Sequence, residues 1–141
     1  MVRSMLLVPL MLVAFVGCGS ESSEPSAGSS TSVAAATTGD GLYPDVVDAV
    51  AESTDGEWRF DVTLSSPYDT PERYADAWRV VGPDGAVFGV RELAHDHQNE
   101  QPFTRSLSGV EIPVGVTTVT IEGRDQLNGW GGATLTLDLP M

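Results

Sequence analysis

The sequence contains no lysine and a single cysteine, and both shortages limit what the chain can do. Its seven basic residues are all arginines and stand against 20 acidic residues, which gives a formal net charge of −13. Binding to a nucleic-acid backbone requires a basic patch, so nucleic acid is excluded as the expected partner. The same charge repels an anionic bilayer surface. One cysteine cannot form an internal disulfide, so the fold must be stable without cross-links.

Long apolar runs are also scarce, and the longest lies at the start of the chain. Arg3 precedes an apolar stretch over residues 5–16, and a small glycine stands directly before Cys18. This is the three-part layout of a secretion signal. Twelve apolar residues are fewer than the roughly 20 that a membrane-spanning helix needs. We therefore expect residues 1–17 to be a signal peptide and not a permanent span.

The four residues Phe15-Val16-Gly17-Cys18 resemble the lipobox of bacterial lipoproteins, with Phe15 in place of the usual leucine. The resemblance implies that the thiol of Cys18 is diacylated and that the signal is cut off just before it. Two acyl chains give stable membrane attachment, because each buried methylene contributes about 0.8 kcal/mol. The expected location is extracytoplasmic, with the lipid on Cys18 anchored in the cell membrane or the outer membrane. The alternative is an ordinary cleaved signal followed by an incidental cysteine.

Residues 18–40 are expected to be the lipidated cysteine and a flexible linker, and residues 41–141 are expected to form one domain. The stretch after Cys18 is mostly Ser, Thr, Ala, Gly, Glu and Pro, which cannot bury a core and is typical of a flexible linker. The remaining residues are close to 100 in number, an ordinary size for one domain.

Alternation of apolar and polar residues dominates this domain and predicts an all-β fold. In residues 57–65, every second residue is a large apolar one. Asp-Gly turns at residues 55–56 and 83–85 are typical of tight hairpins. Residues 86–94 lack a clean alternation, which predicts an edge strand or a bulge. The predicted strands span residues 46–53, 57–65, 74–82, 86–94, 103–110, 116–124 and 133–139.

Seven antiparallel strands at this spacing predict an immunoglobulin-like sandwich. Residues 119–139 resemble the closing hairpin of bacterial immunoglobulin-like and fibronectin type III-like domains, although the cysteine pair of true immunoglobulins is missing. Most of residues 57–139 resembles a group of exported bacterial domains, and this resemblance implies a shared domain without a catalytic activity. The words that carry it are Tyr74-Ala-Asp-Ala-Trp78, Gly82-Pro-Asp-Gly85, His95-Asp-His97 and Glu100-Gln-Pro-Phe-Thr-Arg-Ser106.

Three connections are expected at one end of the sandwich, because successive antiparallel strands alternate in direction. These are residues 66–73, 95–102 and 125–132, whereas the other end is expected to carry only tight turns. Loops on a rigid sandwich commonly carry recognition, so the expected function is a binding or interaction module for a protein or carbohydrate partner. The candidate contact residues are Tyr68, Asp69, Arg105, Asp125 and Trp130.

His95 and His97 allow a second hypothesis, a copper- or zinc-binding lipoprotein. Their spacing puts both imidazoles on one face of an extended segment, which suits chelation of one metal ion. In the competing interpretation, each imidazole hydrogen-bonds a neighbouring loop group and braces the segment, and Arg105 pairs with a local acid. Candidates for a third metal ligand are Glu100 first, then Glu92, Asp69 and Asp125.

Trp130 stands among three glycines and also has two interpretations. Its ring could face solvent and stack on a sugar or peptide, with the glycines permitting close approach, or it could fold back onto the sandwich as a lid. No nucleophile turn, phosphate loop or paired-histidine helix is recognisable, so an enzyme is not expected. A structural envelope protein without a small ligand is the remaining alternative.

Overall fold

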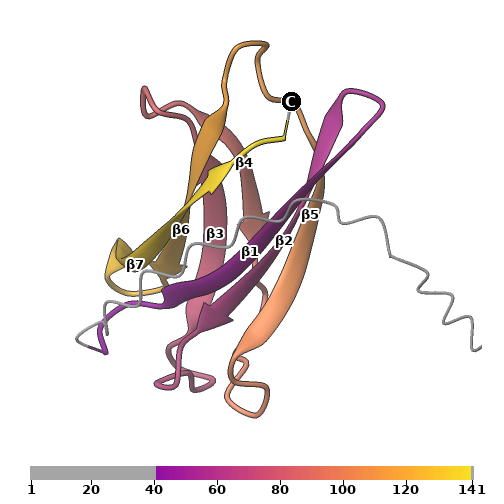
Figure 1. Ribbon diagram of the computed structural model, residues 1–141. Coiled ribbons are helices and arrows are strands. Elements are labelled where there is room, and N and C mark those ends of the chain that lie inside the picture. Colours follow the sequence, from indigo (N-terminus) through magenta and orange to yellow (C-terminus); the bar gives the residue numbers. More distant parts are fainter. Residues whose placement is uncertain (1–40, 141) are drawn as a thin grey trace, which may run out of the picture.

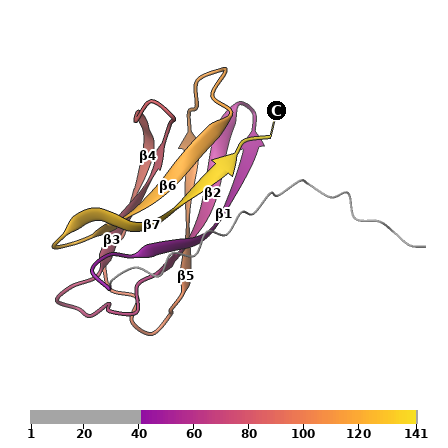
Figure 2. The ribbon, with the colours of Figure 1, turned by 60° about the vertical axis from the view of Figure 1, so that its left-hand side comes forward.

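The computed structural model describes residues 41–140, which form two antiparallel sheets packed face to face (Figures 1 and 2). The predicted signal peptide, Cys18 and the predicted linker lie outside the described residues. The strands are β1 (Asp45–Thr54), β2 (Glu57–Ser65), β3 (Ala75–Val81), β4 (Val87–Glu92), β5 (Phe103–Val110), β6 (Thr118–Asp125) and β7 (Gly129–Asp138).

The predicted seven-stranded all-β sandwich is confirmed. One sheet has the order β1-β2-β5 and the other has the order β4-β3-β6-β7. The fourth strand therefore pairs with β3, whereas in seven-stranded constant immunoglobulin domains it extends the sheet of the first two strands. Residues 41–140 include no helix long and apolar enough to cross a membrane.

The core lies between the sheets and follows the alternation in the sequence. Phe60, Val62 and Leu64 of β2 are fully buried and face Trp78 of β3 and Ile121 of β6. The residues that alternate with the buried ones along β2 and β6 point outward and are exposed or half-buried. Burial of large apolar side chains, at roughly 1.5–3 kcal/mol for each, is the main stabilising contribution.

β4 is an edge strand with a bulge, as its irregular sequence predicts. It pairs only with β3, and the register shifts because Val80 lies opposite Gly89 whereas Val81 lies opposite Val87. Phe88 is the extra residue, and its ring lies over Gly82, where a Cβ would come within 2.6 Å of the ring.

The connections between strands alternate between the two ends, as expected (Figure 1). We call the end with residues 66–74, 93–102 and 126–128 the loop pole, and the end with residues 55–56, 82–86 and 111–117 the far pole. The expectation of tight turns alone at the far pole is wrong, because residues 111–117 form an apolar loop. Val114 at its tip is fully exposed.

The third predicted loop, residues 125–132, is shorter than expected. β7 begins at Gly129, so only three residues separate it from the end of β6. Gly129 has φ of 85°, which suits this tight turn. Trp130 is therefore a strand residue, opposite Arg124 in the β6–β7 ladder.

Candidate functional site

The buried polar side chains of the described domain gather at the loop pole. They are Ser66, Asp69, His97 and Asp125, each at most 3% exposed. Burying a polar group is costly unless it is hydrogen-bonded. The contacts of these four residues therefore determine the form of the pole.

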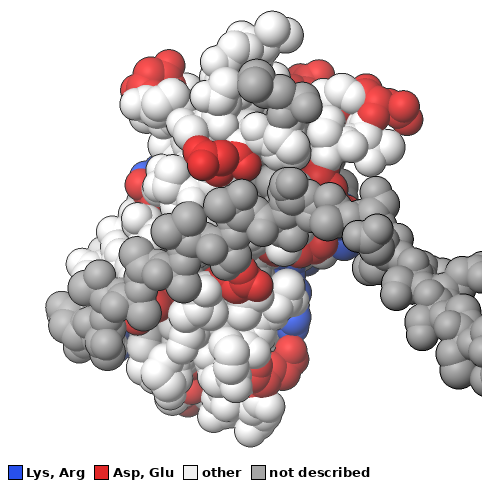
Figure 3. Space-filling view, in the orientation of Figure 1, with Lys and Arg blue, Asp and Glu red and all other residues white. Residues whose placement is uncertain are grey.

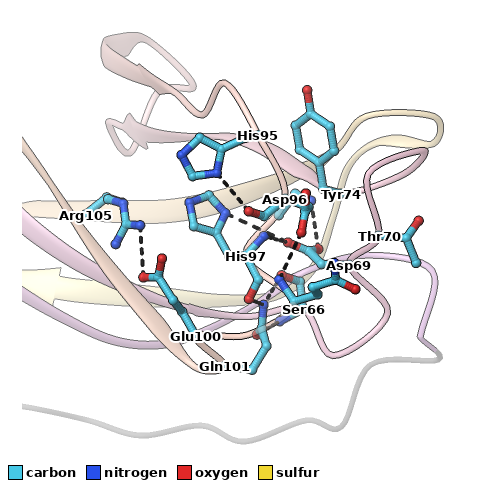
Figure 4. A network of polar contacts seen from close by, with 12 residues as sticks. Ser66, Asp69, Thr70, Tyr74, His95, Asp96, His97, Glu100, Gln101 and Arg105 are labelled. Carbon is cyan, nitrogen blue, oxygen red and sulfur yellow. Dashed lines mark hydrogen bonds and ion pairs between the residues drawn. The ribbon is translucent and has the colours of Figure 1, made fainter.

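Asp69 joins the first two loops of the pole. Its Oδ1 accepts a hydrogen bond from the amide of Ala75 at 3.0 Å, and its Oδ2 accepts one from the amide of His97 at 3.0 Å (Figure 4). One side chain thereby fixes the start of β3 and the middle of the 95–102 loop. Asp69 is an internal support of the pole and not an exposed contact.

Gln101 makes a second connection between the same loops. Its Oε1 accepts from the amide of Ser66 at 2.7 Å, and its Nε2 donates to Ser66 Oγ at 3.1 Å and to the His97 carbonyl at 3.2 Å. These bonds satisfy buried groups on both loops. The two loops therefore form one preorganised unit.

His97 lies inside this unit. Its ring stacks on Phe103 with a centroid distance of 3.8 Å and an interplanar angle of 10°. Its Nδ1 has no hydrogen-bond partner and lies 3.9 Å from Asp69 Oδ2. Burial, followed by the positive charge of Arg105 and then His95, lowers the pKa of His97 below 6.5, so the imidazole is uncharged at neutral pH.

The three predicted metal ligands are engaged in other contacts. His95 Nδ1 lies 2.8 Å from the Asp96 carbonyl oxygen, and Glu100 accepts a hydrogen bond from Arg105 at 3.0 Å. Arg105 lowers the pKa of the exposed Glu100 carboxyl. Within residues 41–140, no three His, Cys, Asp or Glu side chains gather in a group that could hold a metal ion. The contact of His95 fits the bracing interpretation, and Arg105 pairs with the local acid Glu100. The His97 imidazole differs, because it stacks on Phe103 and its Nδ1 has no hydrogen-bond partner.

Asp125 supports the other side of the pole. Its side chain is 0% exposed, and its oxygens accept from Arg73 Nε at 3.1 Å and from the amide of Asn128 at 2.8 Å. Burial by itself raises the pKa of Asp125, but the hydrogen bonds from Asn128 and Arg73 outweigh it and lower the pKa below 3.8. The charged carboxylate is therefore the form that holds the β6–β7 turn.

Arg73 connects this turn to the rest of the pole, and the sequence patterns did not single it out. Besides binding Asp125, its guanidinium lies 4.3 Å from the ring centre of Tyr68 and donates to the Leu42 carbonyl at 2.6 Å. Burial, together with the charge of Asp125, raises the pKa of Tyr68, so its hydroxyl stays protonated. Its position could have indicated this role, because Arg73 lies two residues before β3, and the start of β3 pairs with the end of β6 at Asp125.

Trp130 lies away from the loop pole, and its ring is half-buried. It lies on the outer face of the four-stranded sheet, with its ring centre 4.1 Å from the Arg79 guanidinium and 5.2 Å from that of Arg124. Arg79 also pairs with Glu122, and Arg124 pairs with Asp76.

The glycines beside Trp130 do permit a close approach, but of the chain itself. A Cβ on Gly131 would lie 2.5 Å from the Tyr43 ring, and one on Gly123 would lie 2.8 Å from Pro44. Gly132 also meets Pro44 and has φ of 85°. These glycines form the surface on which the segment before β1 packs.

Acidic side chains are spread over the face seen in Figure 3 and do not gather at one end. The described domain carries 17 acidic residues and six arginines. Five of these arginines form ion pairs at 2.6–3.3 Å from a carboxylate, namely Arg59, Arg73, Arg79, Arg105 and Arg124. The surface therefore offers little unpaired positive charge to an anionic ligand.

Sequence comparison gives one informative relative. The chain is 42% identical over 94 residues to a protein of Halomicrobium mukohataei described as "Putative lipoprotein". The match covers 66% of this chain and 46% of that protein, so the chain spans about half the length of its relative. No model of a protein family matches the chain. No solved structure matches it either.

Proposed function

We propose that the chain is a lipoprotein, anchored outside the cytoplasm through lipid on Cys18, whose sandwich acts as a binding or interaction module. The name of the relative and the lipobox-like residues before Cys18 support the anchor. The module works without catalysis and meets its protein or carbohydrate partner at the loop pole.

One observation carries the binding role: the buried polar side chains of the domain are concentrated at one end. The hydrogen bonds of Asp69 and Gln101 hold two long loops in one arrangement. Ordered loops bind with a smaller entropic cost than mobile ones. The exposed residues that the network displays include His95, Gln98, Asn99 and Glu100.

The anchor is tested by replacing Cys18 with alanine in the full chain. The unsubstituted chain is expected in the detergent phase of a phase-separating detergent and carries the added mass of acyl groups. Cys18→Ala is expected in the aqueous phase or as an uncleaved precursor. Detergent partitioning that is unchanged by the substitution would show that another feature holds the chain to the membrane.

The binding role is tested by photo-crosslinking in the membrane of the producing cell. A photoreactive residue at Gln98 is expected to give a discrete adduct, whereas the same residue at Asp84 of the far pole gives none. Adducts of equal yield at both positions would favour the structural envelope protein. Absence of an adduct at Gln98, together with no binding of glycans by the purified chain, would reject the loop pole as the contact.

A further inference from the structure

We propose that residues 42–45 form a latch whose docking on the four-stranded sheet keeps the loop pole ordered. This inference concerns the regulation of the same pole and so rests on the proposed function. The latch lies at the start of the described domain, and its last residue, Asp45, is the first residue of β1. A pull on lipid at Cys18 therefore reaches the sandwich through these residues.

The latch ties the two sheets together. Pro44 is fully buried and packs on Gly123 of β6, while the Tyr43 ring packs on Gly131 of β7. Asp45 Oδ1 accepts a hydrogen bond from the amide of Ala133 in β7 at 2.8 Å. The chain then enters β1, which pairs with β2 in the opposite sheet. The latch thus spans the seam beside β7.

Two side chains of the loop pole hold the first residue of the latch. The Leu42 carbonyl accepts from Arg73 Nη2 at 2.6 Å and from Asn128 Nδ2 at 3.2 Å. Both of these side chains also bind Asp125, through Arg73 Nε at 3.1 Å and Asn128 Nδ2 at 2.7 Å. Release of the latch therefore removes an acceptor from both side chains that bind the buried carboxylate, while the amides of Leu127 and Asn128 keep their bonds to it.

The coupling extends from Arg73 into the rest of the pole. Arg73 also covers Tyr68 and lies at the end of the loop that contains Asp69. Asp69 in turn holds the His97 amide. Segments that share contacts tend to open together as one cooperative unit. Release of the latch is therefore expected to make local opening of the loop pole more frequent. The latch has a docked and a released state in this proposal, and the order of the loop pole depends on which of the two is populated.

The experiment measures amide hydrogen exchange in the full chain, purified in detergent, for Asp45→Ala and for the matched control Asp48→Ala. Asp48 lies on the same strand and is exposed. Loss of the bond that Asp45 accepts from Ala133 is expected to speed exchange about tenfold at Ala133, which reports the latch, and at Asn128 and His97, which report the pole. Amides of the β2–β5 ladder stay at their original rates, and Asp48→Ala leaves all of these rates unchanged.

Gly132→Ala provides a second, stronger release, because its Cβ would overlap the Pro44 carbonyl. Faster exchange at Ala133 without a change at Asn128 and His97 would overturn the proposal. So would a uniform increase that includes the β2–β5 ladder, since the latch would then be an ordinary part of the fold. The crosslinking test at Gln98 is independent: its failure with these exchange results intact would reject the binding role and leave the coupling standing.

Discussion

The loop pole and the far pole of the sandwich are stabilised by different kinds of contact. At the far pole, local backbone conformation forms the turns: Asp55 and Gly56 both adopt positive φ, and Gly85 has φ of 85°. At the loop pole, Asp69 and Asp125 hold segments that are far apart in the sequence. The turns of the far pole are therefore set by the backbone conformation of a few neighbouring residues. The loops of the loop pole are held in place by a few buried side chains that connect distant parts of the sequence.

Asp125→Ala is expected to show the largest difference in stability between a substitution at the loop pole and one at the far pole. It leaves the Arg73 guanidinium without its carboxylate partner and the Asn128 amide without its acceptor, so the free energy of unfolding should fall by about 3 kcal/mol. Asp84→Ala at the far pole removes one exposed hydrogen bond, which Asp84 accepts from the Ala86 amide, and should cost less than about 1 kcal/mol. Denaturation in urea measures both values. Equal losses would show that the buried carboxylate has no special weight.

The pH dependence of stability between pH 7.5 and 5.5 gives a smaller, specific effect at the loop pole. The unfolded chain takes up a proton on His97 near pH 6.5, whereas the folded chain does so only at lower pH. The unfolded state therefore binds more protons in this window, and stability falls as the pH falls from 6.5 through the lowered pKa.

The histidine substitutions identify the source of that slope. His97→Gln should flatten the dependence, measured as urea midpoints at several pH values. His95→Gln should retain most of it, because burial and Arg105, the two largest causes of the lowered pKa of His97, remain. A slope that survives His97→Gln would assign the effect to another group.

The smallest effect is expected at the tip of the far pole. Val114 is fully exposed, so Val114→Ser removes no buried surface and should change the free energy of unfolding by less than about 0.5 kcal/mol. Thermal unfolding is a sufficient measurement. A loss above 1 kcal/mol would mean that the 111–117 loop supports the fold and that the contrast between the poles is weaker than proposed.

The sequence predicted most of the fold because its signals are local. Alternation placed most of the strands, Asp-Gly turns placed two hairpins, and the irregular residues 86–94 identified the edge strand. The start of β7 was missed, because the glycines around Trp130 read as a loop. Their role is set by Tyr43 and Pro44, nearly 90 positions earlier, and local patterns carry no such contact.

The candidate site was predicted less completely, for the same reason. The alternating direction of the strands predicted which loops share one end, and Asp69 and Asp125 were predicted as contact residues there. Whether a carboxylate faces a partner or supports the backbone depends on which amides surround it in space. Arg73 is the clearest omission, since its importance comes from contacts with Asp125 and Leu42, 52 and 31 positions away.

The bulge in β4 affects how readily another molecule can add a strand to the edge of the sheet. An unbroken edge strand presents a row of free donors and acceptors on which a second molecule can add its own strand, and repeated addition produces fibres. The extra residue Phe88 interrupts that row, and the segment at Tyr43 and Pro44 lies against the start of β7 at the opposite edge of the same sheet. Both edges of the four-stranded sheet are therefore poorer templates for strand addition than a flat, unbroken strand would be.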